Sequence, residues 1–330
     1  MSFFAILVAL LLEQARPLSS TNPIRGGLRA WALSASRNFD AGRPHHGWVA
    51  WTVAVLVPTL FVFGVHALLV WGLGWPFGLL WNVAVLYLTL GFRQFSHHFT
   101  NIRDALLDGD EVRARELLAR WQQVDASELP RSEVVRHVIE YSVLAAHRHV
   151  FGVLACYCIL AACGLGPAGA VLYRLTEFAS RYWSARTNRA SAHLPSPSLQ
   201  RAASLAWTVI DWLPARMTAL SFAVVGNFEE AIEGWRYHAQ RFPNDNDGVI
   251  LAATAGAVDV RLGGSALRAM GDSGFADLGA PDVNEGVDSP STPGRPPENS
   301  HLAQVVGLVW RSVVVWVGLL ALLSFARLLG

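Results

Sequence analysis

Long uncharged stretches alternate with arginine-rich ones along this chain. Between Pro44 and Phe92 there is no Asp, Glu, Lys or Arg residue, and the sequence GLGWPFG at 72–78 divides the stretch into two. A helix needs about 20 apolar residues to cross a bilayer, so the stretch can hold two crossings. We therefore predict a transmembrane hairpin over residues 48–92, with helices at Trp48–Trp71 and Phe77–Phe92.

Three further apolar segments complete the pattern. Residues 305–325 form an apolar run with one arginine, Arg311, and predict a C-terminal transmembrane helix over 304–330. The run FFAILVALLLEQARPL near the N-terminus has no basic residue before it and no small-residue cleavage site. We interpret residues 1–47 as a short retained anchor followed by a basic cytoplasmic loop. The third segment, 150–175, is interrupted by GLGPAG.

Arginine placement sets the expected topology. Arginines are dense before the hairpin, after it, and after residue 175, and the positive-inside rule puts all three regions in the cytoplasm. A single crossing over 150–175 cannot have both ends inside. The Gly-Pro break makes a re-entrant pair of half-helices the alternative, because irregular backbone at membrane depth is tolerated where protein covers it.

The polar regions predict helices and one linker. TNIRDALLDGDEVRARELLARWQQV at 100–124 has leucines at helical spacing on both sides of DGD, which predicts two amphipathic helices. A third helix is expected over 132–150, with Ser132 as its N-cap. Residues 93–268 thus combine cytoplasmic helices with membrane segments. Residues 269–303 are rich in Gly, Pro, Ser and acids without periodicity, and predict a disordered linker.

Composition agrees with an all-α, polytopic membrane protein with four to five membrane segments, the re-entrant pair included. Hydrophobic residues make up 52% of the 330, charged residues 15%, and the mean hydropathy is +0.32. A net charge of +1 argues against a nucleic-acid partner. Cys156, Cys158 and Cys163 share one apolar segment, so we expect small buried side chains there and no metal site. The lipid bilayer of a bacterial inner membrane is the expected surrounding, and a homo-oligomer within it is a further expectation.

Two pairs of charged residues and one pair of histidines stand out before any comparison with known families. Asp211 and Arg216 flank a proline in DWLPAR within an apolar run, where charges are costly enough to suggest a role. Arg136 and Glu140 have the spacing of a helical ion pair, which explains them without function. His97 and His98 are adjacent, so they point about 100° apart on a helix and cannot easily share a metal ion.

Five segments, in order, resemble a known family. They are HFTNIRDALLDGDEVRAR, VDASELPRSEVVRHVIE, GPAGAVLYR, DWLPAR and NDGVILAATAGAVDVRLGG, spread over residues 92–264. Together they are similar to the cobalamin-biosynthesis CobD/CbiB family and its relative AmpE. The resemblance implies a polytopic membrane protein that joins an aminopropanol or its phosphate to a carboxylate of cobyric acid by an amide bond. For AmpE it implies instead a membrane modulator of β-lactamase induction.

The resemblance assigns roles residue by residue. It implies Glu140 and Asp125 as the surviving catalytic acids. It implies ligand-binding roles for His98, Arg174, Asp211, Arg216, Asn246, Arg261, Gly263 and Gly264. The ligand would be a corrinoid or another anionic small molecule, because arginines form bidentate contacts with phosphate and carboxylate groups. We predict that Asn246, Arg261, Arg216 and Glu140 line one polar cavity at the cytoplasmic membrane edge.

Departures from the family pattern shape the functional hypothesis. Residues without a carboxylate or amide group replace family acids and amides at Leu144, Ala145, Arg148, Trp207, Thr208 and Leu251. Mg²⁺ and a nucleotide would be needed only if the chain is an enzyme, and acids are what hold Mg²⁺ against phosphate. The losses favour an AmpE-like binding or signalling protein. The alternative is the amide-forming enzyme of cobalamin biosynthesis. A purely structural scaffold is disfavoured because Asn246, Arg261 and the glycine pair are retained together.

Overall fold

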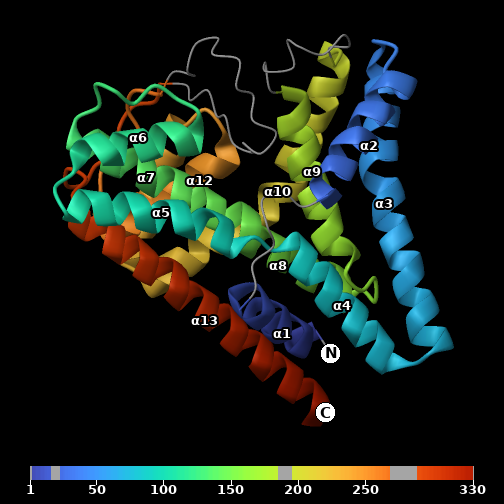
Figure 1. The fold of residues 1–330 in the computed structure, drawn as a ribbon. Helices are drawn as coiled ribbons and strands as arrows, with labels where there is room; N and C mark the ends of the chain where they lie inside the picture. The colour runs from blue at the N-terminus through green and yellow to red at the C-terminus, as the bar shows by residue number, and fades with distance from the viewer. Residues whose placement is uncertain (1, 16–22, 185–194, 268–287, 330) are drawn as a thin grey trace. The chain divides into compact units, whose positions relative to one another are not determined.

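The computed structural model describes residues 2–15, 23–184, 195–267 and 288–329, and these are helical apart from turns, connecting segments and two isolated β-bridges (Figure 1). The elements are α1 (Ser2–Ala15), α2 (Pro23–Phe39), α3 (Pro44–Gly72), α4 (Trp75–Thr89), α5 (Phe92–Leu107), α6 (Glu111–Gln122), α7 (Arg131–Ala146), the π-helical turn η1 (His147–Phe151), α8 (Gly152–Ala162), α9 (Ala168–Ser184), α10 (Pro197–Val225), α11 (Phe228–His238), the 3₁₀ turn η3 (Ala239–Arg241), α12 (Asp245–Val258) and α13 (Asn299–Leu329). The all-helical prediction is confirmed for the described residues.

Four helical segments are long and apolar enough to cross a membrane: Pro44–Gly72, Arg131–Ala162, Pro197–Val225 and Asn299–Ala326. The first and last were predicted. The second starts earlier than expected and ends at the predicted Gly-Pro break, where α8 gives way to α9. Within its most apolar window 83% of the residues are buried inside the protein, so protein, not lipid, covers most of it.

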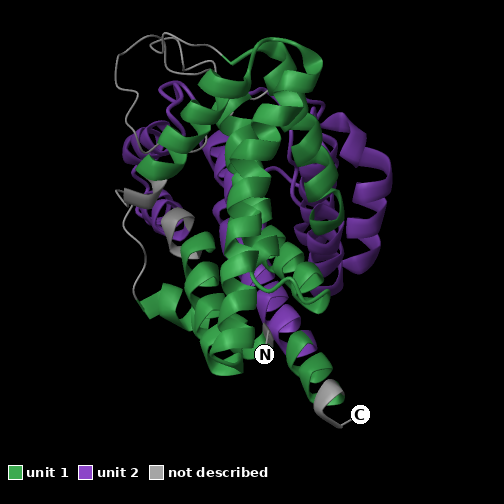
Figure 2. Cartoon of the chain, turned by 90° about the vertical axis from the view of Figure 1, so that its right-hand side faces the viewer, with its two compact units in different colours: residues 1–91, 148–214, 320–330 green, residues 92–147, 215–319 purple. Residues whose placement is uncertain are grey.

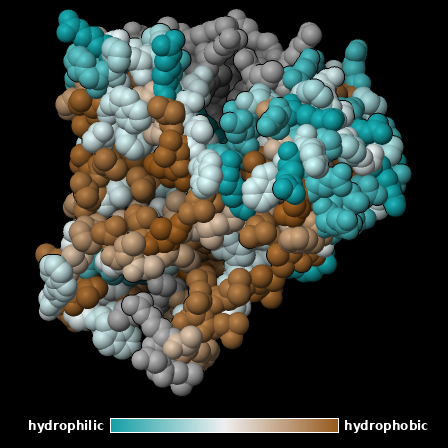
Figure 3. Space-filling view, turned by 180° about the vertical axis from the view of Figure 1, so that it is seen from behind, coloured by the Kyte–Doolittle hydropathy of each residue, from teal (hydrophilic) through white to brown (hydrophobic). Residues whose placement is uncertain are grey.

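The span over Pro197–Val225 was not predicted. The mean hydropathy of its 18-residue apolar window, 1.2, is the lowest of the four, because charged residues interrupt this helix. The other half of the expected hairpin, α4, has 15 residues and is one of the shorter apolar helices. Exposed apolar side chains on α3, among them Leu60, Phe61 and Trp71, fit a lipid-facing surface. Large apolar areas adjoin hydrophilic ones in the space-filling view (Figure 3).

The chain divides into two compact units (Figure 2). Unit 1 comprises residues 1–91, 148–214 and 320–330, and unit 2 comprises residues 92–147 and 215–319. In unit 1, the helices α2, α3, α9 and α10 share a core of small residues around Trp51 and Trp183. A side chain at Gly47 would come within 2.7 Å of the Ser198 backbone, so the starts of α3 and α10 require glycine to approach this closely.

Unit 2 contains the two predicted amphipathic helices and the Ala/Gly-rich segment. The helices α5 and α6 lie on either side of the DGD turn as expected, and Asp110 caps α6 by accepting from the Arg113 N–H. The start of α7 differs from expectation, because the helix begins at Arg131 after Pro130 and Ser132 is inside it. Along α12, a Cβ on Gly256 would lie 2.1 Å from the Glu230 carbonyl, so the small residues serve packing against α11.

The C-terminal part of the expected linker has defined structure. Residues 268–287 lie outside the described residues, but 288–298 pair with the segment after α12 and 299–303 begin α13. Thr292 exchanges hydrogen bonds with Leu262 through backbone and hydroxyl groups, at 2.7 and 2.9 Å. Backbone groups make many of these contacts, which is why a composition rich in Pro, Gly and Ser did not reveal them.

Candidate functional site

A buried ion-pair cluster joins α7 to the loop after α12 within unit 2. We call it the Glu140 cluster and define it as Glu133, Arg136, His137, Glu140, Gly263, Gly264 and Ser265. At its centre Arg136 donates to Glu140 at 3.1 Å, to Glu133 at 2.5 Å and to the Ser265 carbonyl at 2.7 Å. The Arg136 side chain is only 4% exposed. A guanidinium desolvated to this degree needs such partners, and here two carboxylates share one cation.

Glu140 also fixes the glycine loop. Its Oε1 accepts the Gly263 N–H at 2.7 Å, a contact between residues 123 positions apart in the sequence. The loop has φ values of +81° at Gly263 and +128° at Gly264, which side chains other than glycine adopt poorly. A Cβ on Gly263 would also lie 2.8 Å from the Pro290 carbonyl oxygen. The predicted glycine pair is therefore required by backbone geometry and close approach.

A row of aromatic rings runs from the Glu140 cluster to His98. The His137 ring stacks on Tyr141, Tyr141 meets Trp121 edge to face, and Trp121 stacks on His98 with centroids 5.8 Å apart. Burial, and next the neighbouring His97, lower the pKa of His98, so His98 is neutral at neutral pH. The sequence nominated His98 as a ligand-binding residue. In the structure, the rings of Trp121 and Tyr141 lie between His98 and His137.

Two of the nominated ligand-binding residues contact each other in the same unit. Arg216 on α10 donates to the Asn246 side-chain oxygen at 3.0 Å, and Asn246 is buried in the first turn of α12. The helix α12 also packs against α7, which carries Glu140. Arg216 and Asn246, which we expected to line one cavity with Arg261 and Glu140, are thus joined by a direct hydrogen bond.

Arg261 and Asp125 are placed differently from the expected cavity lining. The Arg261 side chain is exposed, and its backbone N–H donates to the Arg295 carbonyl at 2.8 Å. Asp125 is exposed and accepts from the Ser127 N–H and hydroxyl, which lower the pKa of its carboxyl. With these bonds Asp125 caps a local turn. The structure thus joins Glu140 with the glycine loop, and Arg216 with Asn246, but does not bury Arg261 with them.

Arg174 and Asp211 belong to unit 1. Arg174 pairs with Glu177 at 2.7 Å, and the buried Asp211 accepts the Tyr173 hydroxyl at 2.9 Å. Sequence reasoning missed Glu177, Arg136 and His137 as site members. The signal that could have found Glu177 is an acid in the middle of a largely buried helix, with arginines three residues before it and four after it.

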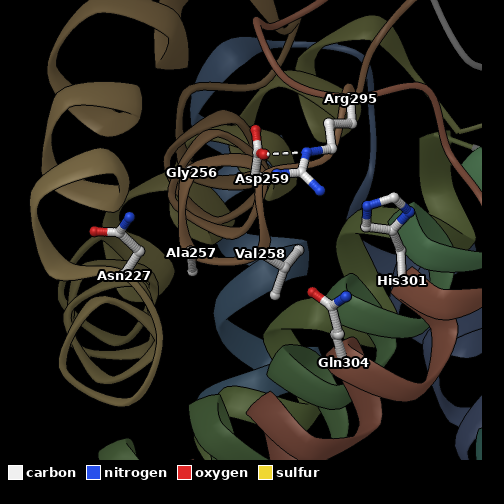
Figure 4. A pocket seen from close by; sticks show the side chains of 8 residues that line it. All are labelled: Asn227, Gly256, Ala257, Val258, Asp259, Arg295, His301 and Gln304. Carbon is white, nitrogen blue, oxygen red and sulfur yellow. Dashed lines mark ion pairs between the residues drawn. The ribbon is translucent and has the colours of Figure 1, made fainter.

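A small polar cavity of about 230 Å³ lies at the end of α12 in unit 2 (Figure 4). An ion pair at 2.8 Å joins Asp259 and Arg295 at its edge, and His301 and Gln304 reach it from α13. Its lining residues are Asn227, Gly256, Ala257, Val258, Asp259, Arg295, His301 and Gln304. None of these was a predicted site residue. In the described part of the chain, no group of three or more His, Cys, Asp or Glu side chains is arranged to hold a metal ion.

Comparison with known proteins identifies the family. The family described as CobD/Cbib protein matches residues 3–285. A protein of Stutzerimonas stutzeri named "Cobalamin biosynthesis protein CobD" is 30% identical over 318 residues, which cover 95% of either chain. This chain belongs to the CobD/CbiB family. Proteins with the same name from Chromobacterium violaceum and Leptospira interrogans are 34% and 28% identical, over 56% and 58% of this chain and 55% and 59% of their own. No solved structure matches the chain.

The positions at which we expect this chain to depart from the CobD/CbiB pattern lie partly in the core and partly at the surface. Leu144, Ala145 and Leu251 are buried in unit 2, and Thr208 is exposed in unit 1. Arg148 is buried in the π-helical turn, a type of local bulge that is frequent at functional sites. Buried apolar residues therefore occupy three positions at which the resemblance led us to expect polar groups, while the Glu140 cluster has its ion pairs.

Proposed function

We propose that this chain is a multi-pass protein of the bacterial inner membrane and carries out the amide-forming step of cobalamin biosynthesis, joining an aminopropanol or its phosphate to a carboxylate of cobyric acid. The observation that carries the proposal is the match along 95% of a relative named as a cobalamin biosynthesis protein. The Glu140 cluster is consistent with it, because its hydrogen bonds hold the glycine loop next to Arg261 in a fixed shape.

Glu140 acts in this proposal as a positioning residue. Both of its oxygens accept hydrogen bonds from Arg136, and one of them also accepts the Gly263 N–H. The carboxylate therefore holds the glycine loop in a fixed shape. Two residues before Gly263, the exposed guanidinium of Arg261 is left at the surface, where it can pair with a carboxylate or phosphate of the substrate.

Complementation tests the proposal. A strain lacking its own amide synthase, supplied with cobyric acid, should make cobalamin when it expresses this chain. Arg261→Gln should lower cobalamin production at an unchanged protein level, whereas Arg120→Gln, at another exposed arginine, should not. Failure of the wild-type chain to complement while it is present in the membrane would overturn the enzymatic proposal.

A second candidate function has a specific observation in its favour. Leu144, Ala145 and Leu251 fill buried positions where the family pattern has polar groups, so the chain can keep the fold while losing the chemistry. Such a protein would be an AmpE-like member that binds a corrinoid or another anion without converting it. The purified chain would then bind cobyric acid and form no amide product when the amine is added.

A further inference from the structure

The cavity at the end of α12, which we call the α12 cavity, is lined by residues of unit 2 alone. Its volume of about 230 Å³ suits a small molecule better than a large cofactor. The side chains of His301 and Gln304 lie next to each other on its α13 side, and the ion pair of Asp259 and Arg295 lies at its edge (Figure 4). None of its lining residues belongs to the Glu140 cluster.

The end of α12 leaves hydrogen-bond acceptors at the cavity. The Leu262 N–H, which would bond to Val258 if the helix continued, donates to the Thr292 hydroxyl at 2.9 Å. Within the part of the chain that the structure describes, no hydrogen bond reaches the Val258 carbonyl oxygen. Asp259 follows in the left-handed conformation that ends the helix. Because a helix C-terminus has a partial negative charge, this carbonyl and the Asp259 carboxylate together favour a cationic donor.

The charged groups around the cavity do not favour an anion. Arg295, the guanidinium among the lining residues, is already paired with Asp259 at 2.8 Å. Two more acids flank the lining: Glu230, whose N–H is capped by the Asn227 side chain, and Glu298, whose N–H bonds to His301. The side chains of Arg295 and Asp259 are 77% and 56% exposed, so water weakens their attraction. An ammonium group can therefore replace Arg295 at the carboxylate.

His301 supplies a donor of fixed direction. The residue is only 4% exposed, and its Nδ1 accepts the Glu298 N–H at 3.0 Å. A ring nitrogen that accepts a hydrogen bond carries no proton, so the ring proton lies on Nε2. No other described residue accepts from this Nε2, and the ring lines the cavity (Figure 4). Since a buried N–H without an acceptor is costly, an oxygen of a ligand in the cavity would be favoured there.

We infer that the α12 cavity binds a small primary amine that has an oxygen substituent on the neighbouring carbon. The ammonium group contacts Asp259 and the Val258 carbonyl, and the oxygen accepts from His301 Nε2. For the identity of the amine the inference rests on the proposed function, whose aminopropanol has this arrangement of groups. Arg261, the proposed contact of the substrate carboxylate, adjoins the cavity, because its N–H donates to the Arg295 carbonyl at 2.8 Å.

Three ligands of the same shape test the two ends of the site separately. Full-length protein in phosphatidylcholine nanodiscs is titrated with 1-amino-2-propanol and followed by saturation-transfer NMR, with empty nanodiscs as the blank. Isobutylamine has a methyl group in place of the hydroxyl, and 2-butanol has one in place of the amine. Each should bind about tenfold more weakly, as expected when one well-placed polar contact is lost. Equal binding of all three would reject the site.

Variants of the ion pair test the ammonium contact. Asp259→Asn removes the charge and keeps a residue that tolerates the left-handed conformation, so the dissociation constant of 1-amino-2-propanol should rise about tenfold. Arg295→Gln removes the competing cation and should tighten binding. The matched control is Asp104→Asn, an acid 53% exposed and paired with Arg103 at 2.8 Å, which should change nothing. If Asp259→Asn binds no worse and Arg295→Gln no better, the inference is overturned.

Two variants of His301 test the contact with the oxygen. His301→Asn keeps an acceptor near the position of Nδ1 for the Glu298 N–H and removes the Nε2 donor. It should bind 1-amino-2-propanol no better than isobutylamine. His301→Gln places an amide N–H near the position of Nε2 and should keep the preference for the hydroxyl. If His301→Asn keeps the same preference as the wild type, the oxygen does not contact His301 and the assignment is wrong.

Complementation separates a failure of this inference from a failure of the proposed function. The strain is supplied with cobyric acid and a limiting amount of aminopropanol. If the wild-type chain fails to complement while Asp259→Asn weakens amine binding in nanodiscs, the site stands and the enzymatic proposal falls. If the wild-type chain complements and Asp259→Asn makes as much cobalamin at the same protein level, the enzymatic proposal stands and the α12 cavity is not its amine site.

Discussion

The Glu140 cluster predicts an order of stability among its variants. Arg136→Gln removes the only charge that the structure shows bonded to both Glu133 and Glu140, and leaves Glu140, whose side chain is 15% exposed, without its cation. Breaking a buried pair in this way lowers the free energy of unfolding by about 3–5 kcal/mol. Glu140→Gln is milder, because Arg136 keeps Glu133 and the Ser265 carbonyl, and glutamine still accepts from Gly263. Its expected cost is about 1–3 kcal/mol.

The comparison is made by titrating dodecyl maltoside micelles with sodium dodecyl sulfate and following helix content by circular dichroism. Arg120→Gln is the control, since its pair with Glu116 has side chains 78% and 60% exposed and should contribute under about 1 kcal/mol. If Arg136→Gln lowers the free energy of unfolding no more than Arg120→Gln does, the ion pairs of the Glu140 cluster do not stabilise the fold. If Glu140→Gln lowers the free energy of unfolding more than Arg136→Gln does, the interpretation that Arg136 neutralises both Glu133 and Glu140 is wrong.

Three further predictions follow from the geometry. Gly263→Ala forces a side chain at positive φ against the Pro290 carbonyl and should lower the unfolding free energy by about 1–3 kcal/mol, whereas Gly307→Ala, where a Cβ meets nothing closer than 3.8 Å, should be near neutral in the same titration. Burial raises the pKa of Glu177, but the charges of Arg174 and Arg181 lower it to about 2, so the ionised carboxylate contributes its full stabilisation above pH 4.5. The difference in unfolding free energy between wild type and Glu177→Gln, on the order of 3 kcal/mol, should therefore disappear as the pH falls from 4.5 towards 2. The positive-inside rule predicts that the region around the exposed Glu116 is cytoplasmic, so a cysteine at this position should resist an impermeant thiol reagent in intact cells and react after lysis. Labelling before lysis would contradict this topology.

Local signals in the sequence predicted much of the fold. The breaks at GLGWPFG, DGD and GLGPAG separate helices as expected, because glycine and proline act on the backbone at their own positions. The span over Pro197–Val225 was missed for the opposite reason. Its charged residues lower the average hydropathy, and in the structure Asp211 accepts a hydrogen bond from Tyr173 and Arg216 donates one to Asn246.

The candidate site was less predictable than the helices. Sequence motifs nominated Glu140 and the glycine pair separately, but the hydrogen bond that joins them depends on tertiary packing across a long stretch of chain. Asp125 matched its motif and is seen to cap a local turn, since an aspartate two residues before a serine does this without help from the rest of the fold. Residue type fixes what a side chain can do, and only its surroundings fix which role it takes.

The pairing of residues 288–298 with the end of the glycine loop also has a practical consequence. The Ala266 N–H donates to the Asp288 side chain at 2.8 Å, so the two ends of the intervening stretch are held one hydrogen bond apart. The entropy of closing such a loop grows slowly with its length, by about 0.6 kcal/mol for each doubling. A fluorescent or affinity domain whose own termini lie close together can therefore be inserted between these ends with little loss of stability, which gives this membrane protein an internal tagging position.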